Sequence, residues 1–112
     1  MSRVTDDVTN WMLMFRWIVK LIRDEFGIDE ARLTRSAVLE TELGLSIETI
    51  EEVMDTIAGS FGIRFPAGTL DEVVRLEELC MLAAWLKGLY KRPGFISDTF
   101  EAAGRRVNPA AG

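Results

Sequence analysis

The sequence contains no histidine and a single cysteine, Cys80, among its 112 residues. The absence of histidine excludes a histidine general base, a histidine-containing triad and a histidine metal site. A single cysteine excludes both a disulfide within the chain and a zinc site built on several thiolates, and it is typical of a reducing compartment. We expect Cys80 to be buried and inert, because it falls within the apolar period of a helix and has no basic neighbour.

Positive charge is also scarce, since 13 Lys and Arg stand against 18 Asp and Glu and the net charge is −5. Such a chain lacks the cationic face that a phosphate backbone requires, so we do not expect nucleic acid as a partner. The longest apolar run, residues 79–86, has eight residues, far fewer than the ~20 that cross a bilayer. No basic segment followed by an apolar one stands at the start. We therefore expect a soluble cytoplasmic protein without membrane insertion.

Apolar residues recur at helical spacing in three regions. In the first, residues 5–26, they stand at positions 8, 11, 12, 15, 18, 19, 22 and 26, the spacing of an amphipathic helix. We expect Thr5 or Asp6 to cap this helix and Gly27 to end it. A second apolar row follows the first on this N-terminal helix, and either covers additional core or forms a homodimer interface. It consists of Met14, Trp17 and Leu21, and Trp11 of the first row belongs to the same surface.

Residues 29–45 show no sustained period and predict a long loop anchored by Val38, Leu39 and Leu43. A second helix is predicted from Ser46 to Phe61, with Gly62 as its end. Its apolar face consists of Ile47, Ile50, Val53, Met54, Ile57 and Phe61.

A third helical region opens at Thr69, where Thr-x-x-Glu predicts a capping box. The region extends towards Tyr90, either as one long helix or as two helices that meet near Arg75. The pattern over residues 1–92 predicts one all-α domain of three to four helices, with an extended N-terminal helix and a long loop between helices 1 and 2. Residues 93–112 predict a partly disordered C-terminal tail, with one or two helical turns between Ser97 and Ala103.

The second helix carries most of the acidic residues of a stretch that has no base. Residues 36–63 contain six acidic side chains and neither Lys nor Arg. Four of them fall at i, i+3, i+4 and i+7 on the helix: Glu48, Glu51, Glu52 and Asp55. This pattern indicates either a solvated helix face or a surface that docks a basic partner. A carboxylate metal site or acid–base site is not expected here, because no histidine accompanies the carboxylates.

Ser46 stands directly before the acidic helix. A serine at this position is usually a helix N-cap. It could also be a modification site, because a phosphodiester is electrostatically favoured at a helix N-terminus.

Residues 18–90 resemble an acyl carrier protein, and the similarity rests on an ordered series of segments. Residues 18–29, IVKLIRDEFGID, resemble the first carrier helix and its exit, and Glu42-Leu43-Gly44 resembles the Asp-Leu-Gly before the prosthetic serine. Residues 47–54, IETIEEVM, followed by 61–66, FGIRFP, are similar to the recognition helix and its end. Residues 76–80, LEELC, are similar to the longer C-terminal helix of the specialised carriers used in lipid A assembly.

The resemblance implies an up-down bundle of acyl-carrier-protein type that performs no catalysis itself. It implies an acyl group held as a thioester on 4′-phosphopantetheine, which the family attaches to the serine of an Asp-Ser-Leu motif. The implied partners are phosphopantetheinyl transferase and acyl-processing enzymes of fatty-acid, polyketide or lipid biosynthesis. Their basic surfaces would read the acidic helix, which makes the four acidic residues a docking face.

The sequence departs from the family at the attachment site, where it reads Gly44-Leu45-Ser46-Ile47-Glu48. With a gap before Ser46, this residue matches the prosthetic serine. Without a gap, Ser46 takes the place of the family's Asp, a helix N-cap, and Ile47 replaces the serine. Two hypotheses follow. The chain is a carrier loaded with 4′-phosphopantetheine through Ser46, or it is an unmodified carrier-like adaptor that binds a partner protein through its acidic helix or its apolar N-terminal helix.

Overall fold

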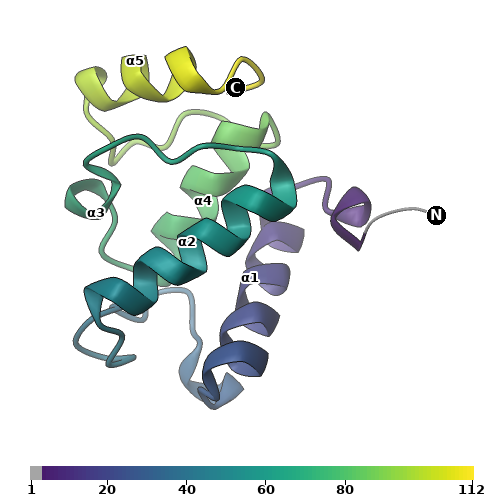
Figure 1. Ribbon diagram of the computed structural model, residues 1–112, viewed down its shortest axis with the longest axis vertical. Helices are drawn as coiled ribbons and strands as arrows, with labels where there is room; N and C mark the ends of the chain where they lie inside the picture. Colours follow the sequence, from purple (N-terminus) through teal and green to yellow (C-terminus); the bar gives the residue numbers. More distant parts are fainter. Residues whose placement is uncertain (1–3) are drawn as a thin grey trace.

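The structure is a computed structural model that describes residues 4–112, and all its regular structure is helical. The elements are η1 (Val4–Asp7), α1 (Trp11–Phe26), η2 (Glu30–Arg32), α2 (Ile47–Phe61), α3 (Thr69–Glu72), α4 (Leu76–Lys87) and α5 (Asp98–Val107). Figure 1 shows α4 behind α2, with α1 to one side and α5 across one end. Within residues 4–112 the only β pairing is an isolated antiparallel bridge between Val38 and Arg75. The all-α prediction is confirmed, with five α-helices in the described part of the chain where three to four were expected.

Helix α4 forms the centre of the core. Eight of its side chains are buried: Leu76, Leu79, Cys80, Leu82, Ala83, Ala84, Trp85 and Leu86. A helix that is apolar on every side is stable only when other elements surround it. Helix α1 packs against α4 and α2, and the buried side chains of all three helices belong to one cluster. The predicted burial of Cys80 is confirmed, and burial raises the pKa of its thiol well above the ordinary value, with the negative charge of Glu77 adding to the effect.

Helix α1 begins later than predicted. Its N-cap is Asn10, whose side-chain oxygen accepts a hydrogen bond from the N–H of Leu13 at 3.0 Å. Thr5 and Asp6, the predicted caps, lie in the separate turn η1. The apolar period alone could not place the start, because Val8 still packs against the core from outside the helix.

Both predicted helix ends at glycine are confirmed. Gly27 has φ +68° and donates its N–H to the carbonyl of Arg23, and Gly62 has φ +67° and donates to the carbonyl of Ala58. Glycine adopts this left-handed conformation without the steric penalty that a side chain brings.

The second apolar row of α1 lies largely against the protein's own core. Met14 is fully buried, and the ring of Trp17 packs edge-on against Phe61 with centroids 4.8 Å apart. Trp11 lies 5.9 Å from the ring of Tyr90. Leu21 also packs against the core cluster and is only partly buried. Much of the apolar surface offered for a homodimer is therefore covered within the chain.

The third helical region divides into two helices, α3 and α4. This is the second of the two predicted alternatives, in which two helices meet near Arg75. Glu78 causes the break, because its carboxylate accepts from the N–H groups of both Val74 and Arg75 at 2.8 Å. The predicted capping box at Thr69 is wrong. Thr69 is already helical, and its hydroxyl donates to the carbonyl of Pro66 at 2.7 Å. The long loop before α2 is confirmed, with Leu39 and Leu43 buried and Val38 half-buried.

The C-terminal segment differs most from its prediction. The expected turns over 97–103 extend to Val107 as α5, and the segment packs on the core instead of remaining partly disordered. Asn108 is buried and exchanges two hydrogen bonds of 2.7 Å with the backbone of Arg64. The indole N–H of Trp85 donates to the Gly112 carbonyl at 2.7 Å. No helix within residues 4–112 is both long and apolar enough to cross a membrane.

Candidate functional site

The N-terminal end of α2 is fixed by Ser46. Its Oγ accepts a hydrogen bond from the backbone N–H of Thr49 at 3.1 Å and lies 2.9 Å from the Thr49 Oγ1. Its backbone is extended, with φ −71° and ψ 163°, as is typical of a helix N-cap. Gly44 sets the approach of the chain with φ +67°, a value that favours glycine. Ser46 is nevertheless exposed, so its hydroxyl is open to solvent at the start of a 15-residue helix.

Ile47 is the first residue of α2, and its placement corrects the sequence prediction. The helical period assigned it to the buried face, but 51% of the residue is exposed. Ile50, one turn later, is buried at 3%. The difference arises because Ile47 lies at the rim of a surface cavity, whereas Ile50 belongs to the core cluster. Ser46 therefore holds the cap position, and a branched apolar side chain follows it.

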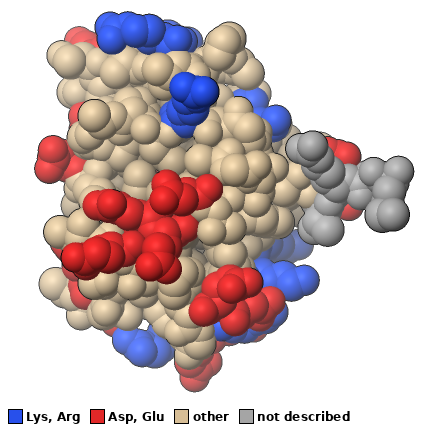
Figure 2. All heavy atoms as spheres, viewed as in Figure 1, with Lys and Arg blue, Asp and Glu red and all other residues tan. Residues whose placement is uncertain are grey.

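The four acidic side chains of α2 form one exposed face, which we call the acidic row. It consists of Glu48, Glu51, Glu52 and Asp55, and all four are exposed. None of them takes part in any ion pair found within residues 4–112. Figure 2 shows acidic atoms gathered over α2 without basic atoms among them. The acidic row therefore leaves its negative charge available to a basic partner.

A cavity of about 240 Å³ lies between the start of α2 and the segment around α3, and we call it the α2–α3 cavity. Two half-exposed apolar side chains stand at its edge, Ile47 at 51% and Val74 at 53%. They are the most exposed large hydrophobic residues of the described chain. The rest of its lining is apolar or acidic, without a base: Leu39, Ile50, Leu70, Val73, Glu40 and Asp71.

Backbone hydrogen bonds hold the far edge of the cavity in place. The N–H of Leu39 donates to the carbonyl of Val74 at 3.0 Å, and the N–H of Leu76 donates to the carbonyl of Ala37 at 2.9 Å. The guanidinium of Arg75 donates to the carbonyl of Ser36 at 2.6 Å. These bonds tie the α3–α4 break to the long loop, so Val74 is presented from a fixed backbone.

Sequence reasoning found one half of this site and missed the other. Ser46 and the acidic row were named from the sequence, and the structure brings them together at one end and one face of α2. Val74 was counted among the apolar residues of the third helical region, which could be one long helix or two helices that meet near Arg75, and it was not named as a site residue. The signal that could have found it is Glu78, four residues later, a side chain able to cap a helix that starts near Arg75. Within residues 4–112 no three His, Cys, Asp or Glu side chains are arranged to hold a metal ion.

Comparisons of this chain with protein-family models, with curated proteins and with solved structures find no match.

Proposed function

We propose that this chain is a carrier-like adaptor that binds a partner protein through the acidic row and the α2–α3 cavity, without catalysis of its own. The observation that carries this proposal is the position of Ile47 and Val74. The two most exposed large hydrophobic residues of the described chain, at 51% and 53%, stand at the edge of the same cavity. The acidic row begins one residue after Ile47 on the same helix.

The charges around the cavity define the partner. The acidic row has no counter-ion among residues 4–112, and Glu40 and Asp71 add two further carboxylates to the cavity lining. A partner with lysine or arginine side chains would complement this surface and associate faster, mainly through long-range attraction. Salt would weaken the association, because exposed charges are screened beyond about 8 Å at physiological ionic strength.

The size of the cavity supports a side chain as its occupant. A volume of about 240 Å³ lies below the roughly 300–1,000 Å³ of typical small-molecule sites. Protein interfaces commonly place one apolar anchor in a pocket and surround it with polar contacts. We therefore propose a basic segment with one aliphatic or aromatic anchor that inserts between Ile47 and Val74.

A defined peptide tests this proposal. A lysine-rich amphipathic helix with one central leucine should shift the amide NMR signals of residues 46–55 and of Val74. A peptide with alanine in place of that leucine, or with glutamates in place of the lysines, should bind more weakly. Shifts located elsewhere, or equal affinity for all three peptides, would contradict the proposal.

Matched variants separate charge from the apolar anchor. Val74→Ser should weaken binding about fivefold, because an apolar contact worth about 1 kcal/mol is lost, whereas Val107→Ser on α5 should not. The pair Glu48→Gln and Glu51→Gln should weaken binding by a similar factor, at about 0.5 kcal/mol for each exposed charge pair. Glu25→Gln, an exposed acid on α1, is the charge control.

A second candidate function is a carrier loaded with 4′-phosphopantetheine through Ser46. The exposure of this serine at the N-terminus of α2 favours it, because backbone N–H groups at that position stabilise a phosphodiester. Coexpression with a broad-specificity phosphopantetheinyl transferase, followed by measurement of the intact mass, separates the two functions. If the natural chain gains mass and Ser46→Ala does not, the chain is a carrier. If the mass of the natural chain stays unchanged, the adaptor function remains.

A further inference from the structure

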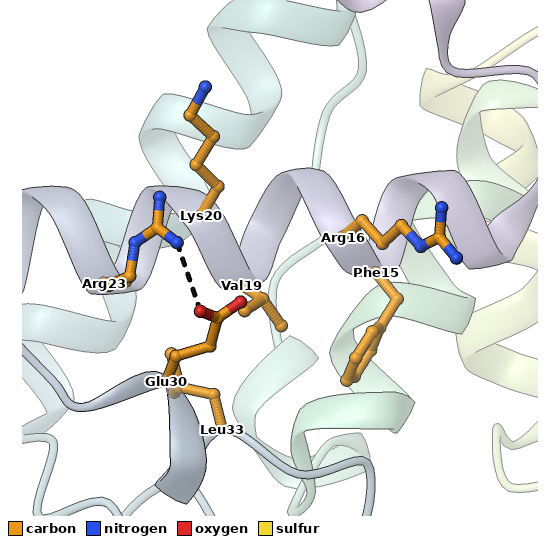
Figure 3. Close-up of a pocket in the computed structure, with 7 residues that line it drawn as sticks. All are labelled: Phe15, Arg16, Val19, Lys20, Arg23, Glu30 and Leu33. Carbon is orange, nitrogen blue, oxygen red and sulfur yellow. Dashed lines mark hydrogen bonds and ion pairs between the residues drawn. The ribbon is translucent and has the colours of Figure 1, made fainter.

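A second cavity, of about 420 Å³, lies between α1 and η2 and shares no residue with the surface described above. Figure 3 shows the residues that line it: Phe15, Val19 and their neighbours on α1, with Glu30 and Leu33 on the facing segment. Its volume lies within the roughly 300–1,000 Å³ of typical small-molecule sites. We call it the α1–η2 cavity.

Three apolar side chains give the cavity its apolar surface. Val19 and Leu33 are core residues, exposed by 8% and 4%. Phe15 is half-buried, and its ring packs edge-on against Trp11 with centroids 6.4 Å apart. Because Val19 and Leu33 are almost fully buried, the half-buried ring of Phe15 supplies most of the apolar surface that a ligand could reach.

The charged groups differ between the two ends of the cavity: Arg23 is in ion pairs, whereas Arg16 is in none within the described part of the chain. The Arg23 guanidinium donates to Asp24 at 2.9 Å and to Glu30 at 3.3 Å, so its single positive charge at this end of the cavity is paired with two negative charges; Figure 3 draws the contact with Glu30. Lys20 points away from Phe15 and Glu30 in Figure 3. Arg16 stands at the Phe15 end, and its guanidinium makes no ion pair or hydrogen bond with any side chain of residues 4–112.

We propose that the α1–η2 cavity binds a small organic carboxylic acid, with its carboxylate on Arg16 and its apolar body over Phe15, Val19 and Leu33. A guanidinium binds a carboxylate through two parallel N–H···O bonds. A bare inorganic anion would leave the apolar surface uncovered. A neutral apolar molecule would form no charge-assisted hydrogen bond with Arg16, and the positive charge of Arg16 would repel an ammonium compound.

An NMR titration with 4-phenylbutyrate tests the site on the intact chain. The methyl signals of Val19 and Leu33 should shift on binding, with a dissociation constant on the order of 1 mM. The neutral 4-phenylbutanamide keeps the apolar body and removes the charge, so it should bind about tenfold more weakly. Arg16→Gln should reduce the affinity for 4-phenylbutyrate by the same factor, because it removes the charge-assisted hydrogen bonds.

Arg106→Gln provides the matched control, since Arg106 is an exposed arginine on α5 and should leave the affinity unchanged. Phe15→Leu, which shortens the wall of the cavity, should weaken the acid and the amide alike. Equal binding of the acid and the amide, equal losses in Arg16→Gln and Arg106→Gln, or no shift of the Val19 and Leu33 methyls would overturn the proposal. Shifts at Ile47 and Val74 in their place would also overturn it.

Discussion

The hydroxyl of Ser46 accepts a hydrogen bond from the backbone N–H of Thr49 at 3.1 Å, and this bond makes Ser46 the cap of α2. In the acyl carrier family that the sequence resembles, an aspartate stands directly before the serine that carries the prosthetic group. In this chain the cap is a serine, and Ile47 follows it. The assignment of function therefore depends on two neighbouring positions.

If the chain is the proposed unmodified adaptor, replacing Ile47 with serine should create an attachment site. The substitution puts a hydroxyl directly after the cap, on a residue that is 51% exposed, so the fold should tolerate it. Coexpression with a broad-specificity phosphopantetheinyl transferase should add mass to Ile47→Ser but not to the natural chain or to Ile47→Ala. A natural chain that gains mass would count against the adaptor assignment, and an Ile47→Ser chain that gains none would count against the alignment that places Ile47 at the position of the prosthetic serine.

Removing the cap should destabilise the domain whichever function is correct. Ser46→Ala leaves the N–H of Thr49 without its partner and should lower the free energy of unfolding by about 1 kcal/mol. Ser46→Asp keeps an oxygen acceptor and should retain most of the stability. Urea unfolding of the three proteins provides the measurement. Equal stability of Ser46→Ala and the natural chain would mean that the hydrogen bond contributes nothing.

Sequence reasoning located the helix faces that follow from hydrophobic periodicity and the helix ends that follow from glycine. The apolar face of α2 from Ile50 onward and the ends at Gly27 and Gly62 followed directly, because each signal is local and needs no tertiary partner. It misplaced the elements whose stability comes from distant contacts. Asn10 replaces Thr5 as a cap although both residue types suit that role, and Asn108 helps to hold the C-terminal segment through the backbone of Arg64, 44 positions away.

In the candidate site, too, the local features could be predicted from the sequence and the features that need distant contacts could not. The acidic row is a run along one helix and could be read from the sequence. The α2–α3 cavity could not, because Ile47 and Val74 are 27 positions apart and come to line one cavity only in the folded chain. The α1–η2 cavity likewise combines one helix with a loop that shows no periodic pattern.

Gly104 should be intolerant of a side chain although it lies within a helix. A Cβ at this position would stand 2.7 Å from the Cζ3 of Trp85, which is fully buried. Gly104→Ala should therefore lower the free energy of unfolding, because overpacking costs about 1–3 kcal/mol against a propensity gain of about 1 kcal/mol. Gly59→Ala in α2 meets no atom within 4 Å and should stabilise the domain. Thermal unfolding measures both, and a Gly104→Ala protein as stable as Gly59→Ala would refute the close packing of α5.

Cys80 should make the domain less stable at alkaline pH. Burial raises the pKa of its thiol in the folded state well above the ordinary value, whereas the unfolded chain ionises near pH 8.5. Above that pH the unfolded state loses a proton that the folded state retains. The free energy of unfolding therefore falls as pH rises, with a slope of up to about 1.4 kcal/mol per pH unit from this residue.

The comparison with Cys80→Ala isolates this effect. The variant loses a titrating group and also leaves a small cavity, so its absolute stability should be lower near neutral pH. Its stability should decline less steeply between about pH 8 and pH 10, because every other titrating group is shared with the natural chain. Urea unfolding at a series of pH values gives both curves. Parallel curves would show that the thiol ionises equally in both states and would contradict its burial in the folded domain.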